Sequence, residues 1–477
     1  MSRKGKLDIV LHDVLIENIA AEGKAVAHAR LDGDEPYSPG RILFVEFAVP
    51  GDVVDVRITR KKKNFLEGRI INIKKPSDQR LEPFCEHFGT CGGCRWQPLP
   101  YPVQLAAKQR QVYDQLTRIG HLTIPEISPI IGSEKTVFYR NKLEYSASDR
   151  RWLLPGEDPA ALSDADRPGL GFHVGKFFDK VLDIRRCWLQ REPSNEIRLF
   201  IKDYALRNGL SFYNIRDNIG CLRNMFVRTA DDGQLMLIVC FGEDSPEVGR
   251  LMDAVREHFP GITSLYYVIN TKGNDSISDQ ECILHSGSPY IIEHMEGLSF
   301  RIGPKSFYQT NSAQALQLYG KAREFAALTG KETVYDLYTG TGTIAQFVSG
   351  SAAKVIGIEY VPEAIMDARA NAEANGITNC QFFAGDMKEV LNEAFIIRHG
   401  KPDVIIVDPP RAGMHPDVVH TILKASPGRI VYVSCNPASQ ARDIAMMQES
   451  YKVTAVQPVD MFPHTQHVEN ICLLELC

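Results

Sequence analysis

The sequence lacks a long apolar run. No stretch of its 477 residues approaches the roughly 18 consecutive apolar residues that a membrane-spanning helix requires. The first residues are basic, but Asp8 interrupts the apolar segment that a secretion signal would need. Internal repeats and low-complexity tracts are also absent. Hydrophobic residues make up 44% and charged residues 24%, which excludes long disorder, collagen and a coiled coil as the main architecture. We therefore expect a cytoplasmic globular protein that does not bind membranes.

The sequence also lacks the even cysteine count of a disulfide framework. It has 11 cysteines and no secretion signal. Most are predicted to be small core residues, but Cys85, Cys91 and Cys94 crowd into a segment rich in glycine and proline. Their Cys-x5-Cys-x2-Cys spacing suits zinc or an iron–sulfur cluster on physical grounds. The Cys-x3-Cys-x2-Cys pattern of radical enzymes is absent.

The chain is long enough for about three domains. Residues 1–80 carry 15 basic and 12 acidic side chains, although the whole chain has a net charge of −5. Short strands separated by glycine or polar residues predict a closed, OB-like β-barrel here, with strands at Leu7–Val10, Ala25–His28, Ile42–Val45, Val53–Ile58 and Phe65–Ile73. The four cations of residues 60–63 indicate either a solvated hairpin tip or a loop that contacts nucleic-acid phosphates.

The rest of the chain changes character twice. Residues 81–300 are predicted to form an α+β domain with a helix over 101–119 and an exposed insertion loop over 154–169. Residues 301–477 are predicted to form a Rossmann-like domain. Apolar runs alternate there with helical segments, which predicts parallel strands at Thr333–Leu337, Val355–Glu359, Gln381–Phe383, Val404–Asp408 and Ile430–Ser434.

A glycine-rich turn follows the first of these strands. Residues 334–343 end in a Gly-x-Gly turn before a helix, so a ligand can approach the backbone at Tyr338 and Thr343. The next strand ends at Glu359, where a carboxylate can accept hydrogen bonds from both ribose hydroxyls of a nucleoside cofactor. Asp386, after the third strand, could reach an adenine edge. Residue 345 is alanine, so the full Gly-x-Gly-x-x-Gly motif of NAD sites is absent and S-adenosylmethionine is favoured.

Three further motifs follow later strands. Asp408 begins an Asp-Pro-Pro-Arg sequence whose prolines fix a rigid exit from the sheet. Cys435 lies in Ser-Cys-Asn-Pro at a strand tip, which makes it a candidate nucleophile rather than an inert core thiol. Glu469 precedes the final strand, Ile471–Leu476, and is a candidate general base at the same edge.

Together these four motifs resemble the RNA uracil-C5-methyltransferase family, which makes 5-methyluridine in bacterial 23S rRNA and tRNA. Residues 307–311, Phe-Tyr-Gln-Thr-Asn, resemble the family element whose glutamine, here Gln309, contacts the cofactor. The N-terminal barrel resembles the TRAM domain of the family. Cys85, Cys91 and Cys94, with the distant Cys187, resemble the four ligands of the [4Fe-4S] cluster in the 23S rRNA branch. The insertion at 154–169 lengthens the separation between Cys94 and Cys187.

The resemblance implies a function. The expected enzyme transfers a methyl group from S-adenosylmethionine to C5 of a uridine in 23S rRNA, through a covalent bond between Cys435 and C6 of the base. Many relatives carry cysteine where this chain has Thr339; we expect little consequence, because residue 339 is expected to contribute only its backbone. The cluster is expected to be structural or to contact RNA.

Several alternatives stay open at this stage. A tRNA substrate is possible because the catalytic motifs do not separate the two RNA classes. A non-catalytic RNA-binding protein would not need Cys435, Glu469 and Asp408 together. Cytosine C5-methyltransferases generally place the nucleophile in a Pro-Cys context, unlike the Ser-Cys-Asn-Pro found here. The oligomeric state is not predicted.

Overall fold

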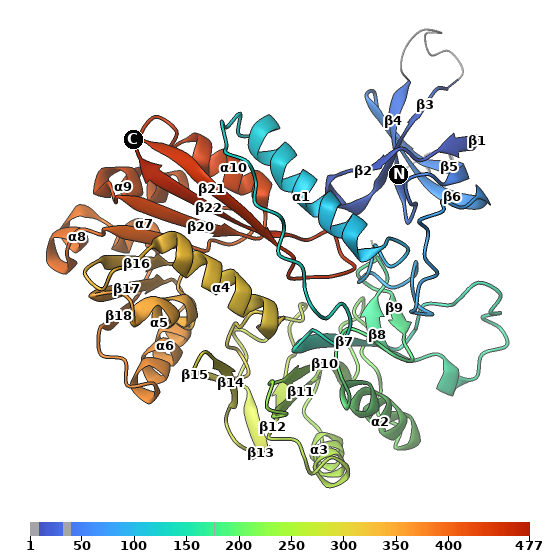
Figure 1. Ribbon diagram of the computed structural model, residues 1–477. Helices are drawn as coiled ribbons and strands as arrows, with labels where there is room; N and C mark the ends of the chain where they lie inside the picture. The colour runs from blue at the N-terminus through green and yellow to red at the C-terminus, as the bar shows by residue number, and fades with distance from the viewer. Residues whose placement is uncertain (1–8, 32–39, 176) are drawn as a thin grey trace.

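The N-terminal strands form a small curled sheet. The computed structural model describes residues 9–31, 40–175 and 177–477. Six strands pair in the order β1-β5-β6-β4-β3-β2 around their own apolar core; their bounds are β1 Val10–Leu15, β2 Asn18–Ile19, β3 Ala25–Ala29, β4 Arg41–Glu46, β5 Val53–Lys61 and β6 Phe65–Lys75. β1 lies against β3, so the sheet curls as a barrel does (Figure 1).

Two details of this barrel differ from the prediction. No pairing between β1 and β2 appears in the described part of the chain, so the barrel is partly open, because β2 has only two residues to offer. The first half of the predicted strand Leu7–Val10 lies outside the described residues, and the observed β1 begins at Val10. The four cations of residues 60–63 are exposed where β5 turns into β6, which agrees with a hairpin tip.

A helix follows the cysteine-rich segment. α1 (Tyr101–Arg118) begins just after Pro100, with a proline in its first turn, and ends within one residue of the prediction. Its buried side chains recur every four residues, at Gln104, Lys108, Val112 and Leu116. This face packs on α10 (Pro437–Ala445) and β21 (Tyr451–Val459), more than 300 residues later in the chain.

The central part of the chain forms a mixed sheet. Its order is β13-β12-β11-β10-β7-β8-β9, with β7 Lys142–Ser148, β8 Gly169–His173, β9 Val181–Asp183, β10 Leu222–Thr229, β11 Leu235–Phe241, β12 Ser264–Ile269 and β13 Ile283–Gly287. α2 (Ser194–Arg207) and α3 (Pro246–His258) pack on one face. The predicted insertion loop connects β7 to β8 and contains only a short 3-10 turn, Asp164–Asp166.

The last part is a doubly wound sheet reached through the hairpin of β14 (Ile291–Met295) and β15 (Leu298–Ile302). The sheet order is β18-β17-β16-β19-β20-β22-β21. The five predicted parallel strands are present as β16 Thr333–Leu337, β17 Lys354–Glu359, β18 Cys380–Ala384, β19 Val404–Val407 and β20 Arg429–Ser434. β22 (Glu469–Leu476) then runs antiparallel to both of its neighbours, β20 and β21.

Helices cover both faces of this sheet. One face carries α4 Ser312–Ala326, α5 Thr343–Ser349 and α6 Pro362–Ala374. The other face carries α1 and α10 with α7 Met387–Val390, α8 Glu393–His399 and α9 Pro416–Ala425. The strand order reverses between β16 and β19, and ligands bind at such a switch point, outside the carboxyl ends of the strands.

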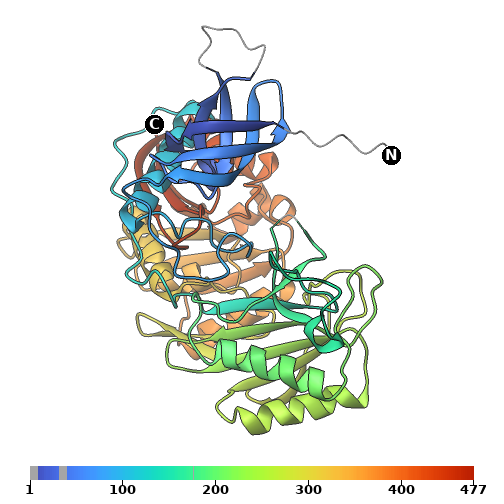
Figure 2. The same ribbon diagram turned by 90° about the vertical axis from the view of Figure 1, so that its right-hand side faces the viewer.

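The three parts of the molecule meet around this edge. Figure 2 shows the N-terminal barrel at one end, the α2–α3 layer at the other, and the doubly wound sheet between them. The boundaries proposed at residues 80 and 300 stay predictions, since α1 belongs by sequence to the central segment but packs on the last sheet. Within the described residues, no helix is both long and apolar enough to cross a membrane.

Candidate active site

A cavity of about 1130 Å³ opens at the carboxyl ends of the parallel strands. Six of the predicted site residues line it together: Gln309, Tyr338, Glu359, Asp408, Cys435 and Glu469. They come from the ends of five different strands and from the segment before α4. The topology of the sheet therefore gathers side chains that lie up to 160 residues apart in the sequence.

Cys435 lies in a tight turn between β20 and α10. The amide of Asn436 donates to the Ser434 hydroxyl at 3.1 Å, and the Asn436 side chain accepts from Ala438 N, which caps α10. These bonds fix the backbone on both sides of Cys435. Cys435 is partly exposed and lines the cavity, so it is not part of the apolar core.

Three acidic groups share the nucleophile end of the cavity. Burial raises the pKa of Asp408 to about 7, and burial together with Asp408 raises the pKa of Glu469 to about 8. Burial and the carboxylates of Glu469 and Asp408 raise the pKa of the Cys435 thiol to about 12. Without ligands, Cys435 and most of Glu469 therefore keep their protons at neutral pH.

Arg411 is the cation that opposes these shifts. It lines the cavity and lowers the pKa values of both Cys435 and Glu469. Its backbone carbonyl accepts from Asn436 Nδ2 at 2.9 Å and from the Ser439 hydroxyl at 3.1 Å. The turn that presents the thiol thus also holds the arginine loop. No role for Arg411 is predicted from the sequence, although it ends the Asp-Pro-Pro-Arg motif.

The turn after β16 forms another part of the cavity wall. Tyr338, Gly340 and Gly342 all adopt positive φ, at 64°, 55° and 75°. A side chain at Gly342 would meet Ala368 and Phe382 at about 2.9 Å, so that glycine is required for packing. No neighbouring atom lies within 4 Å of a side chain built at Gly340, which leaves its backbone open to a ligand.

Glu359 holds this turn. Its carboxylate accepts from Gly340 N at 3.1 Å and from Val361 N at 3.0 Å, and it lines the cavity as predicted. A carboxylate already oriented by two amides can receive the hydroxyls of a ribose without reorganisation.

A buried acid that the sequence reasoning missed supports the same turn. Asp336 is fully buried; it accepts hydrogen bonds from the Thr339 hydroxyl and from Ala345 N at 3.0 Å. Burial raises the pKa of Asp336 to about 7. The expectation that residue 339 contributes only backbone is therefore wrong, because its side chain bonds the acid that anchors the turn.

Gln309 reaches the cavity from a segment held by the central sheet. The side-chain amide of Asn141 donates to Gln309 O at 2.8 Å and to the Ser312 hydroxyl at 2.9 Å, and its backbone amide donates to Thr310 O. Ser312 in turn donates to the buried Glu293. Asn141, which the sequence did not single out, thus ties the residues around Gln309 to the start of β7.

Two predicted cofactor residues do not line the cavity. Thr343 is buried at the start of α5, with its hydroxyl 3.3 Å from that of Thr341. Asp386 caps α7 by accepting from Lys388 N at 3.2 Å, and its charge acts on the Tyr338 hydroxyl nearby. Their roles toward a cofactor stay predictions.

The four predicted cluster ligands line a second cavity of about 820 Å³. Burial raises the pKa of Cys91 to about 11 and that of Cys187 to about 12. The other three thiols are close enough to Cys187 to raise its pKa further. In the described ranges, however, no three His, Cys, Asp or Glu side chains converge closely enough to hold one metal ion. The predicted iron–sulfur site is therefore not shown, although its four thiols share one space.

Known proteins match the chain over almost all its length. A model of the family described as tRNA (Uracil-5-)-methyltransferase matches residues 291–476, and a TRAM domain model matches residues 12–71. Relatives from Porphyromonas gingivalis and Bacteroides thetaiotaomicron, each described as an uncharacterized RNA methyltransferase, are both 55% identical over 96% of this chain. The alignments cover 98% and 100% of their own lengths.

One solved structure matches the whole architecture. It is the Pyrococcus abyssi tRNA (uracil-54, C5)-methyltransferase in complex with S-adenosyl-L-homocysteine, with a TM-score of 0.73 and 28% identity. The match covers 97% of this chain and all of the other.

Proposed function

Since the chain belongs to the RNA uracil-C5-methyltransferase family, whose members use S-adenosylmethionine, we propose that Cys435 and Glu469 methylate a uridine through a covalent adduct. The observation that carries this proposal is the single cavity in which the thiol and the carboxyl face the turn of Tyr338 and Glu359. The nucleophile, the general base and the cofactor wall are thereby within reach of one uracil ring.

The uracil ring needs a nucleophile because its C5 is too electron-poor to attack a methyl group. The Cys435 thiolate adds to C6, and the displaced electron pair makes C5 an enolate carbon. S-adenosylmethionine supplies the methyl group that C5 takes. Glu469 then accepts the C5 proton, the C5–C6 double bond forms again, and the C6–sulfur bond breaks to return the thiolate.

The acidity of the site sets a condition on these steps. Cys435 must lose its proton before it can attack, and Glu469 must be ionised before it can accept one. Both pKa values are raised in the free protein, to about 12 and about 8. Arg411 favours the ionised forms, so it supports both residues electrostatically.

The cofactor wall is proposed to bind S-adenosylmethionine through residues of four segments. Glu359 is positioned to bind the ribose, and the open backbone at Gly340 lies beside it. Gln309, Tyr338 and Asp408 line the same space, while Asp386 and Thr343 are proposed to act from behind it. The acidic character of this space suits a cationic sulfonium.

The RNA substrate is proposed to be 23S rRNA. The support is the set of four cysteines around one cavity, which the resemblance associates with that branch. A tRNA substrate is the second candidate, because the solved neighbour acts on tRNA uracil-54. In either case the target base must leave its stack to reach Cys435. An RNA substrate also makes a cytoplasmic location the natural proposal.

The four cysteines are proposed to hold a [4Fe-4S] cluster. Cys85, Cys91, Cys94 and Cys187 supply the donor set that such clusters take, and they line one cavity from two segments far apart in the sequence. The cluster binds a thiolate on each of four irons, so its ligands need not converge on one point as they do around a single ion. It would fasten the cysteine-rich segment to the strand region before α2.

One experiment decides the substrate and the product together. Purified protein is incubated with methyl-labelled S-adenosylmethionine and either 23S rRNA or bulk tRNA from cells that lack the gene. We expect 5-methyluridine in 23S rRNA only, at one position by mapping. Product in tRNA alone would establish the second candidate, and 5-methylcytidine would contradict the proposed chemistry.

A further inference from the structure

The turn between β21 and β22 forms one wall of the catalytic cavity. This 460–467 turn carries Phe462 and His467 into the cavity, and Glu469 follows two residues later. Burial and nearby cations lower the pKa of His467 to about 4, so its ring is neutral. The shape of the turn thus decides where the proposed base and two neighbouring rings stand.

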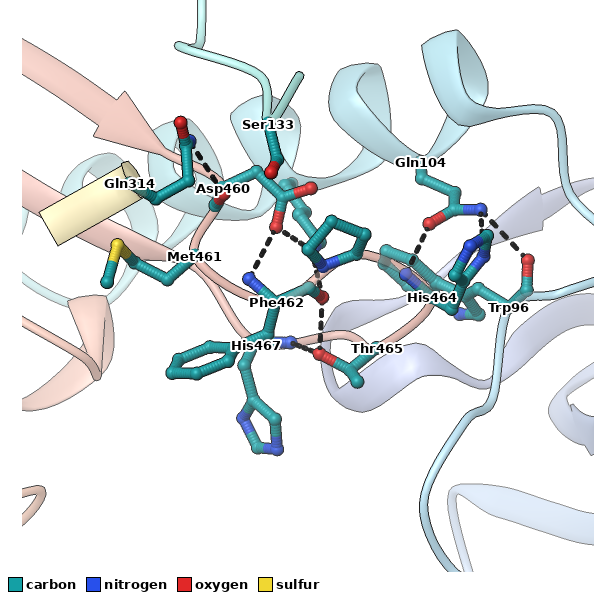
Figure 3. A network of polar contacts seen from close by, with 12 residues as sticks. Trp96, Gln104, Ser133, Gln314, Asp460, Met461, Phe462, His464, Thr465 and His467 are labelled. Carbon is teal, nitrogen blue, oxygen red and sulfur yellow. Dashed lines mark hydrogen bonds and ion pairs between the residues drawn. The ribbon is translucent and has the colours of Figure 1, made fainter. Parts of the chain in front are cut away.

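Side chains of helix α1 form hydrogen bonds and an ion pair with the first half of this turn (Figure 3). The Lys108 ammonium lies 2.5 Å from Asp460 Oδ1 and donates to Phe462 O at 3.0 Å. The amide of Phe462 donates to the same carboxylate at 3.0 Å, and the Tyr101 hydroxyl donates to Asp460 Oδ2 at 2.8 Å. One ammonium therefore bridges the carboxylate and the carbonyl that frame the backbone at Phe462.

The second half of the 460–467 turn is held by Gln104, which precedes Lys108 by one helical turn of α1. Gln104 accepts from His464 N at 2.9 Å, and its Nε2 lies 3.2 Å from His464 Nδ1. The same amide donates to Trp96 O and Leu99 O, at 3.0 and 2.9 Å. Because Gln104 and Lys108 are four residues apart, they lie on one face of α1 and hold the turn at two points.

These contacts cost folding energy that apolar residues would not cost. Lys108 and Gln104 are both 0% exposed. Burying a charge or an amide requires complete pairing, and apolar replacements for a buried ion pair are often as stable or more stable. Packing alone does not explain polar residues at these positions, whereas fixing a backbone does.

We propose that Tyr101, Gln104 and Lys108 are positioning residues for methyl transfer. They fix the 460–467 turn so that Phe462, His467 and Glu469 hold their places in the cavity. This inference rests on the proposed function of Glu469 and deepens it. It also links the reaction to the cysteine-rich segment, since Trp96 N and Arg95 N both donate to His464 O.

The inference predicts a split between catalysis and cofactor binding. Of the proposed cofactor residues, Glu359 ends β17 and Tyr338 directly follows β16, and no hydrogen bond in the described structure joins either of them to α1. Loosening the 460–467 turn should therefore lower kcat and leave the dissociation constant of S-adenosylmethionine unchanged.

The test uses Lys108→Met and Gln104→Met in the full-length protein. Calorimetry with S-adenosylmethionine gives its affinity and the fraction of chains that bind it, and kcat is expressed per binding chain. We expect kcat to fall on the order of 10- to 100-fold, as a misplacement of about 1 Å can cause, with an affinity within about twofold of wild type. Gln104→Met keeps the test valid if Lys108→Met does not fold.

Leu116→Ala is the matched control. Leu116 lies on the same buried face of α1 and packs in the apolar core between α1 and the last sheet. It should lower the melting temperature but not kcat per binding chain. Wild-type kcat in both test variants, or losses no larger than in the control, would overturn the proposal, as would a parallel loss of affinity. Failure of the proposed function is separate, because wild-type protein itself would then form no 5-methyluridine.

Discussion

Two cavities of this molecule are built around cysteine thiols, and their charges differ. The catalytic cavity contains one thiol, five acidic residues and three basic ones: Glu359, Glu363, Asp367, Asp408 and Glu469 against Arg140, Lys305 and Arg411. The second cavity contains four thiols, one acid, Glu144, and three cations, Arg140, Lys142 and Arg186. Arg140 and Thr310 line both, so the two cavities adjoin.

This contrast shows how one side-chain type takes on two kinds of chemistry. An acidic cavity attracts a cationic sulfonium, and it keeps a lone thiol protonated until a positive charge enters the cavity. A cavity with several cations accommodates four thiolates, which are negative when they bind metal. The surroundings of a cysteine therefore separate a nucleophile from a ligand more clearly than its own burial does.

The largest effect that would sharpen this contrast comes from the catalytic pair. Cys435→Ala should abolish methylation and leave no covalent adduct with RNA. Glu469→Gln should still permit addition and methyl transfer but slow proton removal by on the order of 10²–10⁴. The RNA should then stay attached to Cys435 and appear as a shifted band on a denaturing gel.

The double variant is the control for this experiment. Cys435→Ala with Glu469→Gln should show no shifted band. A band that persists would identify another nucleophile. Lost turnover without any band in the single Glu469→Gln variant would mean that Glu469 acts before or during addition, and its role as the late base would be wrong.

The second prediction concerns the other cavity. Protein purified without oxygen should be brown and contain about four irons per chain, because four thiols form the donor set. Cys187→Ser should lose the iron and the visible absorbance. Cys221→Ser, which changes a buried cysteine outside this cavity, is the matched control and should keep both. Zinc without colour would contradict the iron–sulfur proposal.

The third prediction tests the cofactor wall. Glu359→Ala should weaken S-adenosylmethionine binding by roughly 10- to 100-fold, because charge-assisted hydrogen bonds contribute about 1.5–3 kcal/mol. Glu363→Ala removes another acid of the same cavity that lies on α6, so it controls for charge alone. Calorimetry gives both constants. Equal losses in the two variants would show that Glu359 acts only through its charge.

The sequence predicted the doubly wound sheet well for a physical reason. Buried parallel strands are continuous apolar runs, and the chain shows five of them with helical segments between. Because their carboxyl ends share one edge, Asp408 and Cys435 could be placed beside Glu359 without coordinates. β21 was not predicted from the sequence, although Tyr451–Val459 is rich in β-branched residues and apolar and polar residues alternate at its start.

The residues that support the site could not be found in this way. Lys108 contacts Asp460, which is 352 positions away, and Asn141 contacts Gln309 at a separation of 168. Such pairs leave no periodicity in the sequence. The helix itself was predicted to within one residue, but an apolar pattern could not show that its buried face begins with Gln104 and Lys108. Polar burial follows from the partner, and the partner comes from the fold.

The smallest predicted effect concerns the positive charge that S-adenosylmethionine brings into the catalytic cavity. With its pKa raised to about 12, only about one Cys435 thiol in ten thousand is ionised at pH 8. A sulfonium in the cavity should lower that pKa, whereas S-adenosylhomocysteine lacks the methyl group and with it the positive charge. Alkylation of Cys435 by iodoacetamide, followed by mass spectrometry, should therefore be roughly three- to tenfold faster with S-adenosylmethionine than with S-adenosylhomocysteine. The rate follows the ionised fraction of the thiol, and one pKa unit, about 1.4 kcal/mol, changes that fraction about tenfold. Cys282, which is partly exposed and lines neither cavity, should react equally with both ligands. Equal rates at Cys435 would show that the sulfonium does not act on the thiol, and its activation would then have to come from the RNA.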